Sequence, residues 1–128
     1  MNNRTETSEQ QAVIEWSLWN RGRYPELETL HHTVNEGKRS VSNGTMLKSI
    51  GMSKGFPDLS LNCAKGAYHS LHIEMKRDRR SRASKEQKDW IARLNKWGNC
   101  AVICYSADEA ISVLEQYLNL KPGERMKQ

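Results

Sequence analysis

The sequence predicts an α/β domain in which a central mixed β-sheet is flanked by helices. Segments with helical caps and helical periodicity alternate with short β-rich segments along the chain. The composition, 37% hydrophobic and 27% charged over 128 residues, is typical of one compact domain. We therefore expect a single domain over residues 1–128, with an ordered core at about 8–120 and a polar C-terminal tail.

Residues 7–20 are predicted to form the first helix. Ser8 is its expected N-cap, because Gln11 follows at the three-residue spacing of a capping box. Apolar side chains at helical spacing then define the face that we expect to pack on the core. These residues are Ala12, Val13 and Trp16.

After this helix the chain loses clear periodicity. Residues 26–31 form a short segment of uncertain type, for which a strand entering the core is one interpretation. Residues 32–51 are rich in Gly, Asn and Ser, so we expect a loop with one short helix at 45–50.

Two short β-rich runs, residues 56–61 and 68–75, are separated by turn-forming residues and predict a β-hairpin. In the second run apolar and polar residues alternate, so the period of two places Glu74 and Lys76 on the same face. By the same rule, Asp58 in the first run points to the other face of its strand from Leu59 and Leu61. If the strands pair as neighbours, Asp58 and Glu74 project from one face of the sheet.

A second helix is predicted to begin after Ser84, which has Gln87 at capping-box spacing, and to end at Gly98. Its apolar stripe consists of Trp90, Ile91, Leu94 and Trp97.

Residues 100–105 predict a buried strand, and residues 107–118 predict an amphipathic helix, for which Ser106 and Glu109 have capping-box spacing. The two cysteines of this strand would lie about 13 Å apart, too far to bind one zinc ion together. We expect them to be core thiols.

The chain is basic, with 20 Lys and Arg against 15 Asp and Glu and a formal charge of +5. Residues 76–85, KRDRRSRASK, hold six cations and one acid. This favours a polyanionic partner, although a solvated loop explains the run equally well. The odd number of cysteines, the polar N-terminal segment and the absence of a long apolar run predict an intracellular, cytoplasmic protein without a membrane span.

Four residues could carry chemistry: Asp58 and Glu74 on one sheet face, Lys76 beside them, and Gln87 at the start of the following helix. Taken singly, each has an ordinary structural explanation as a turn residue, a surface charge pair or a cap. The four residues taken together are not explained in this way, because two neighbouring carboxylates repel each other unless a cation lies between them. Oxygen ligands favour a hard cation, Mg²⁺ or Mn²⁺, and an ammonium nearby can orient a nucleophile.

These residues resemble a known family. The ordered motifs GFPDL, HIEMK and SKEQKDW, preceded by SEQQAVIEW and a loop with Asn35, Gly37, Lys38 and Arg39, are similar to the VRR-NUC branch of the PD-(D/E)XK nuclease superfamily, in its stand-alone, phage-like form. The resemblance covers roughly residues 8–118. It implies a restriction-endonuclease-like core with a central mixed sheet flanked by helices.

The resemblance also implies roles for individual residues. Asp58, Glu74 and the backbone carbonyl of Met75 would bind the metal ion, Lys76 would assist the attacking water, and Gln87 would support the site.

The family has a further metal-proximal acid on its first helix, for which Glu9 and Glu15 are the candidates here. Glu9 is favoured because it lies at helical spacing with the predicted core face, whereas Glu15 points away from it. The alternative is that Glu9 only complements the helix dipole.

The implied DNA-binding residues are basic and lie in loops. They are Lys38, Arg39, Lys54, Arg77, Arg79, Arg80 and Arg82. The loop around residues 35–37 reads Asn-Glu-Gly where the family commonly has Asn-Gly-Gly, which weakens the case for DNA contacts there.

The expected activity is that of a Mg²⁺-dependent, structure-specific DNA endonuclease that cuts branched DNA such as Holliday junctions as a homodimer, located in the host cytoplasm if the gene belongs to a bacteriophage. Alternatives are a nicking or restriction-type nuclease on linear duplex DNA, a catalytically inactive nucleic-acid-binding module, and a basic protein whose partner is another protein.

Overall fold

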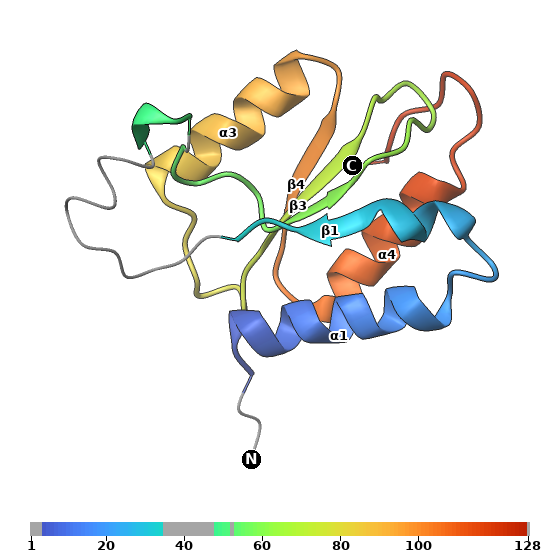
Figure 1. The fold of residues 1–128 in the computed structure, drawn as a ribbon, viewed down its shortest axis with the longest axis horizontal. Helices are drawn as coiled ribbons and strands as arrows, with labels where there is room; N and C mark the ends of the chain where they lie inside the picture. Colours follow the sequence, from blue (N-terminus) through green and yellow to red (C-terminus); the bar gives the residue numbers. More distant parts are fainter. Residues whose placement is uncertain (1–3, 35–47, 52, 128) are drawn as a thin grey trace.

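The computed structural model describes residues 4–34, 48–51 and 53–127 (Figure 1). The named elements are, in chain order, α1 (Glu6–Trp19), the 3-10 helix η1 (Pro25–Thr29), β1 (Leu30–His32), β2 (Leu59–Leu61), β3 (Leu71–Met75), α3 (Lys85–Lys96), β4 (Cys100–Cys104) and α4 (Ala107–Leu118). Within the described residues, no helix is both long and apolar enough to span a membrane.

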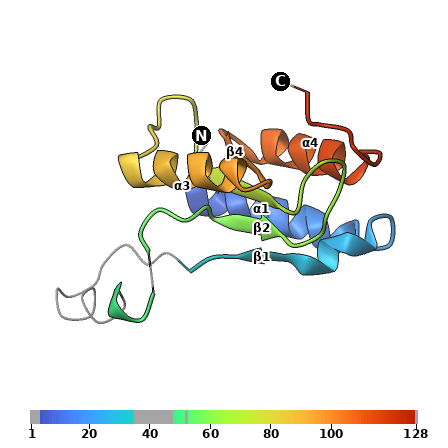
Figure 2. The same ribbon diagram turned by 90° about the horizontal axis from the view of Figure 1, so that it is seen from above.

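The four strands form one mixed sheet in the order β1-β2-β3-β4. The first three are antiparallel, and β4 pairs with β3 in parallel. In Figure 1, α1 and α4 lie together on one face of the sheet and α3 lies on the other. Figure 2, seen from above, shows β1 at one edge of the sheet with β2 beside it. The predicted α/β class, with a mixed sheet flanked by helices, is confirmed.

The core lies between the sheet and the α1–α4 pair. Its fully buried members come from all of these elements, and they include Val13, Leu59, Leu71, Ile73, Leu114 and Tyr117. Burial of apolar surface of this extent is the main favourable contribution to folding. The cysteines of β4 are buried in this core, as expected.

The predicted hairpin is present, with shorter strands than expected. Leu59 pairs with Ile73 and Leu61 with Leu71. The first strand cannot extend to residue 56 because Pro57, which has no N–H to donate, precedes Asp58.

The polar face of β3 is buried rather than exposed to water. Gln87 of α3 contacts Glu74 there, and the ring of Phe56 makes an edge-on contact with His72. On this face, the Ser70 hydroxyl donates to Asn99 Oδ1 over 2.7 Å and lies 2.8 Å from His72 Nε2. His72 Nε2 therefore carries the proton, and Nδ1 accepts from the Ser60 hydroxyl at 2.8 Å. Burial lowers the pKa of His72, which keeps the ring neutral.

The predicted start of α1 was wrong. The helix is capped by Thr5, and Ser8, the expected cap, occupies the third helical position and completes the capping box. Ser8 and Gln11 have the correct spacing, but Thr5 and Ser8 have the same spacing one turn earlier. The buried residues of α1 are Val13 and Ser17, whereas Ala12 is exposed.

The caps of α3 and α4 were predicted correctly, with two differences. Trp97, expected in the apolar stripe of α3, is 72% exposed. Ser106 caps α4 through the Glu109 N–H, but the Glu109 carboxylate accepts from Tyr105 N–H instead of returning to Ser106, so the box is half formed.

The segment after α4 is not a loose tail. The Glu124 carbonyl accepts a hydrogen bond from Ala67 N–H at 2.8 Å, and Met126 N–H donates to the Tyr68 hydroxyl at 3.0 Å. The tail therefore contacts the β2–β3 connection. Residues 26–29 belong to η1 and residues 30 and 31 begin β1, so the strand interpretation was right only for the last two residues of this segment. Most of the short helix expected at 45–50 lies outside the described residues.

Candidate active site

Three carboxylates meet at one end of the sheet. Glu6 from α1, Asp58 from the segment before β2 and Glu74 from β3 each offer an oxygen atom, and these atoms all lie within 4.8 Å of one another. No other cluster of three or more His, Cys, Asp or Glu side chains within the described ranges has this metal-binding geometry.

Asp58 is placed by hydrogen bonds at both its backbone and its side chain. Its carbonyl accepts from Thr33 N–H at 2.8 Å, and its Oδ2 accepts from Met75 N–H at 2.7 Å. Extending the β2–β3 register by one residue puts Asp58 opposite Glu74. The hairpin therefore brings the two carboxylates together, as the period of two predicts.

The loop before Asp58 packs on the first turn of α3. Gly55 has a φ of +94°, and a Cβ atom there would lie 2.7 Å from the carbonyl carbon of Glu86. Phe56 makes an edge-on ring contact with Trp90 at 5.0 Å. This close approach fixes the start of α3 relative to Asp58.

Glu74 is 2% exposed. Burial first, and then the charge of Asp58 and a hydrogen bond with it, raises the pKa of Glu74 to about 9, against a partial opposing effect of Lys76. Without a cation, the site holds a proton near neutral pH. A buried carboxylate that faces two more carboxylates is the environment that a divalent cation stabilises, and an all-oxygen donor set suits Mg²⁺ or Mn²⁺.

Gln87 joins Glu74 of β3 to Lys76, the residue that follows this strand. Its Oε1 accepts from Lys76 Nζ at 2.9 Å, and its Nε2 donates to Glu74 Oε2 at 3.1 Å. Lys76 Nζ also lies 3.6 Å from Glu74 Oε2. The capping box with Ser84 fixes Gln87 in the first turn of α3. Lys76 is 5% exposed, so its ammonium group depends on these two partners.

The structure brings Asp58, Glu74, Lys76 and Gln87 together, but it puts Glu6 where Glu9 was expected. Glu9 Oε1 instead accepts from Ala107 N–H at 2.9 Å and pairs with Arg4 at 3.3 Å. Glu9 packs against the start of α4, as its spacing with the core face of α1 indicates. The acidic cluster lies instead at the end of the sheet. Glu6 was missed because the helix was predicted to start at residue 7; the Thr5–Ser8 capping pair was the signal for the earlier start.

Glu15 is exposed and lies outside the acidic cluster. Met75, whose carbonyl was expected to bind metal, ends β3 and is fully buried.

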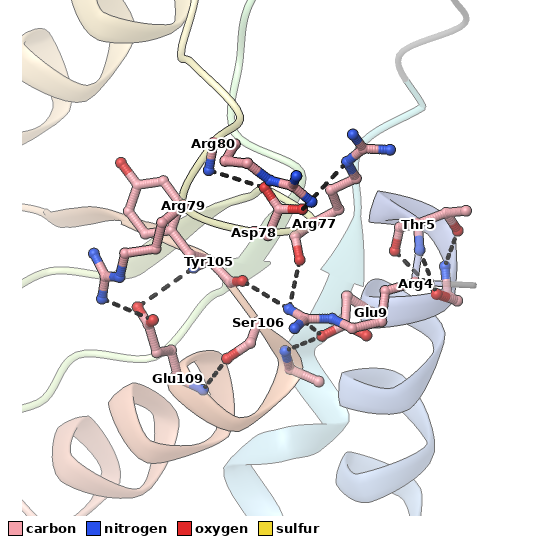
Figure 3. A network of polar contacts seen from close by, with 12 residues as sticks. Arg4, Thr5, Glu9, Arg77, Asp78, Arg79, Arg80, Tyr105, Ser106 and Glu109 are labelled. Atoms are coloured by element: carbon pink, nitrogen blue, oxygen red, sulfur yellow. Dashed lines mark hydrogen bonds and ion pairs between the residues drawn. The ribbon is translucent and has the colours of Figure 1, made fainter. Parts of the chain in front are cut away.

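A basic loop, residues 77–82, follows Lys76 directly. A recess of about 450 Å³ is lined by Arg4 and by residues 77–80. The Asp78 carboxylate pairs with Arg77 at 3.5 Å and Arg80 at 3.4 Å, and Arg79 pairs with Glu109 at 2.9 Å (Figure 3). These exposed pairs contribute little to stability, so the arginines can exchange partners for phosphates.

Of the other predicted basic contacts, Arg82 is exposed and lines a second recess of about 550 Å³ beside Lys88 and Tyr105. Lys54 is exposed just before Gly55. Lys38 and Arg39 lie outside the described residues.

Known proteins match this chain in sequence and in fold. The family model described as the VRR-NUC domain matches residues 4–108. A solved structure of a "VRR_NUC domain protein" is similar, with a TM-score of 0.84 and 34% sequence identity over 99% of this chain and 100% of that chain. No curated protein gives a significant match.

Proposed function

Because the chain belongs to the VRR-NUC family of nuclease domains, we propose that it hydrolyses phosphodiester bonds in DNA with a divalent ion, Mg²⁺ or Mn²⁺, bound by Glu6, Asp58 and Glu74. The observation that carries this proposal is the convergence of three carboxylate oxygens within 4.8 Å, one of them on a buried residue. We propose the Met75 carbonyl as a further ligand, since Met75 follows Glu74 at the end of β3.

A bound divalent ion would supply Lewis acidity and promote ionisation of water at the site. Lys76 contributes a positive charge that is held in one position, because its ammonium group donates to Gln87 Oε1 at 2.9 Å. We propose that this ammonium orients the attacking water and stabilises the charge that develops on the phosphate. Gln87 keeps Lys76 and Glu74 at a constant separation while this happens.

We propose that DNA binds along the basic loop after β3. Arg77, Arg79, Arg80 and Arg82 would contact backbone phosphates, and Lys54 would do so from the other side of Asp58. Contacts of this kind give affinity without sequence specificity and weaken steeply with salt. We propose the same role for Lys38 and Arg39 on the basis of the sequence alone.

For the substrate, we propose branched DNA, including four-way junctions, cut by a homodimer. A twofold axis would place two copies of the site so that symmetric strands are cut in pairs. The support for this step is the family resemblance and the small size of the domain, which offers a limited surface to a large substrate on its own.

The direct test is to incubate the purified protein with labelled linear, flap and four-way DNA in Mg²⁺ or EDTA. We expect Mg²⁺-dependent cleavage that is strongest on the four-way substrate. Equal cutting of linear duplex would instead support a nicking or restriction-type enzyme.

Asp58→Asn and Lys76→Ala should abolish strand scission while DNA affinity stays within about tenfold, because phosphate contacts lie elsewhere. Asp89→Asn, which removes an exposed carboxylate that pairs with Lys85 within α3, is the matched control. Unaltered cleavage by Asp58→Asn would contradict the proposed site, and salt-sensitive binding without cleavage by the parent protein would indicate a binding module.

A further inference from the structure

The N-terminal turn of α1 carries Glu6, but little apolar packing holds it in place. Both buried residues of the helix, Val13 and Ser17, lie in its second half. Residues 5–7 are exposed, and residues 8–10 are only partly buried. Because helix ends open easily when they lack buried contacts, another interaction must fix Glu6 near the carboxylates of the sheet.

Arg4 supplies that interaction by binding two backbone carbonyls that lie just beyond the ends of two strands. Its guanidinium group donates to the carbonyl of Arg77, which follows β3, and to the carbonyl of Tyr105, which follows β4, the latter at 3.0 Å (Figure 3). The Arg77 carbonyl is one residue beyond Lys76. Arg4 therefore links the start of α1 to the same end of the sheet that carries Glu74 and Lys76.

Glu9 completes the link one turn further along the helix. Its Oε1 accepts from the N–H of Ala107, the first residue of α4, and lies 3.3 Å from Arg4 Nη2. The free N–H groups at a helix start favour a negative charge at this position. The Glu9 side chain is 14% exposed, so this pair is better shielded from solvent than the other ion pairs of the basic loop.

We propose that Arg4 and Glu9 are positioning residues that hold Glu6 against Asp58 and Glu74. The contacts that Arg4 and Glu9 make with each other, with the two carbonyls and with α4 form a latch, and the metal site is complete only when this latch is formed. This inference rests on the proposed function. It gives Glu9 a role distinct from metal binding, since its carboxylate is used by Arg4 and by α4.

The test measures Mn²⁺ binding directly, through loss of the free-ion electron paramagnetic resonance signal, without DNA or cleavage. Arg4→Met and Glu9→Gln should weaken Mn²⁺ binding by about three- to tenfold, below the range typical for groups bonded directly to metal ligands. Glu6→Gln should weaken it at least as much. Arg4→Lys should recover most of the affinity, because one nitrogen atom, Arg4 Nη2, makes all of these contacts and an ammonium group also offers three donors.

Two comparisons separate positioning from general destabilisation. If Arg4 acts through Glu6, adding Arg4→Met to Glu6→Gln causes no further loss of Mn²⁺ affinity. Glu109→Gln, which breaks the Arg79 pair at the start of the same helix α4, should leave Mn²⁺ affinity unchanged. Circular dichroism identifies any variant that fails to fold, and Glu9→Gln and Arg4→Lys then carry the test.

The possible outcomes distinguish this inference from the proposed function. Normal Mn²⁺ affinity in Arg4→Met and Glu9→Gln, with loss in Glu6→Gln, would overturn the latch and leave the metal site intact. Additive losses in the double variant would also overturn it. Unchanged affinity in both Glu6→Gln and Asp58→Asn would overturn the metal site itself.

Discussion

Gln87 donates a hydrogen bond from Nε2 to the buried carboxylate of Glu74 over 3.1 Å, while its other amide atom accepts from Lys76. One neutral side chain thus contacts both the carboxylate of Glu74 and the ammonium group of Lys76. The geometry depends on an amide, because a carboxylate at this position would repel Glu74 and an alanine would leave Lys76 with one partner fewer.

We therefore expect Gln87→Ala to reduce cleavage by about 10- to 100-fold, the range found for residues that orient metal ligands. The loss of the capping box should reduce stability by only about 1 kcal/mol. Cleavage rates at saturating Mg²⁺, together with thermal unfolding, measure both effects. Gln116→Ala on the exposed side of α4 is the control. A rate equal to that of the parent protein would show that the amide has no part in the chemistry.

The raised pKa of Glu74 predicts how metal-free stability changes with pH. With a pKa of about 9 in the folded state against the ordinary value of 4.5 for a glutamate, the folded protein keeps a proton that the unfolded chain releases. The stability that this proton provides is complete below pH 4.5 and is lost as pH rises toward 9.

Glu74→Gln keeps the neutral form at every pH, so it should unfold at a higher temperature than the parent protein in EDTA above pH 8. A gain of about 1 kcal/mol corresponds to roughly 3–6 °C for a domain of this size. The difference should shrink toward pH 5. A constant difference from pH 5 to 9 would contradict the assigned pKa.

Metal binding should release a proton from Glu74, because the ion and the proton compete for the same oxygens. Titration calorimetry at pH 7.5 in buffers of different ionisation enthalpy should show release of about one proton per Mn²⁺ bound. In Glu74→Gln, the binding heat should be weak and independent of the buffer. Buffer-independent heat in the parent protein would mean that Glu74 is already ionised before the metal binds.

The two glycines before Asp58 provide a matched pair. Gly51 and Gly55 both have positive φ angles, +103° and +94°. Among the described residues, a Cβ atom at Gly51 would meet no atom within 4 Å, whereas one at Gly55 would meet atoms of Glu86 and Gln87. Backbone strain is therefore common to both substitutions, and crowding is specific to one.

Gly55→Ala should destabilise the protein by about 1–3 kcal/mol more than Gly51→Ala, because the added methyl group displaces the first turn of α3. It should also reduce cleavage, since Gln87 lies in that turn. Urea unfolding of both variants measures the difference. Equal free energies of unfolding would show that the contact with α3 is not tight.

Sequence reasoning located most of the site because strand periodicity and helix caps are local signals. The alternation in residues 71–76 put Glu74 and Lys76 on one face, and the Ser84 cap placed Gln87 at the start of α3. Glu6, the α1 member of the acidic cluster, was missed because two overlapping capping pairs, Thr5–Ser8 and Ser8–Gln11, allowed two helix starts and the later one was chosen.

Burial on the second face of the sheet was also beyond local reasoning. His72 and Glu74 alternate with apolar residues, as on a solvated strand, yet both are buried, Glu74 against Gln87 of α3 and His72 against the ring of Phe56. The apolar stripe of α3 predicted that the helix packs against the rest of the domain, but Trp97 is the C-cap after the last helical residue, Lys96, and its side chain is exposed.

The most direct measurement for the metal site is anomalous diffraction from a crystal soaked in Mn²⁺. We predict one strong anomalous peak at about 2.0–2.3 Å from carboxylate oxygens of Glu6, Asp58 and Glu74. A peak that contacts Glu9 in place of Glu6, or no peak at this cluster at a Mn²⁺ concentration that supports cleavage, would contradict the account.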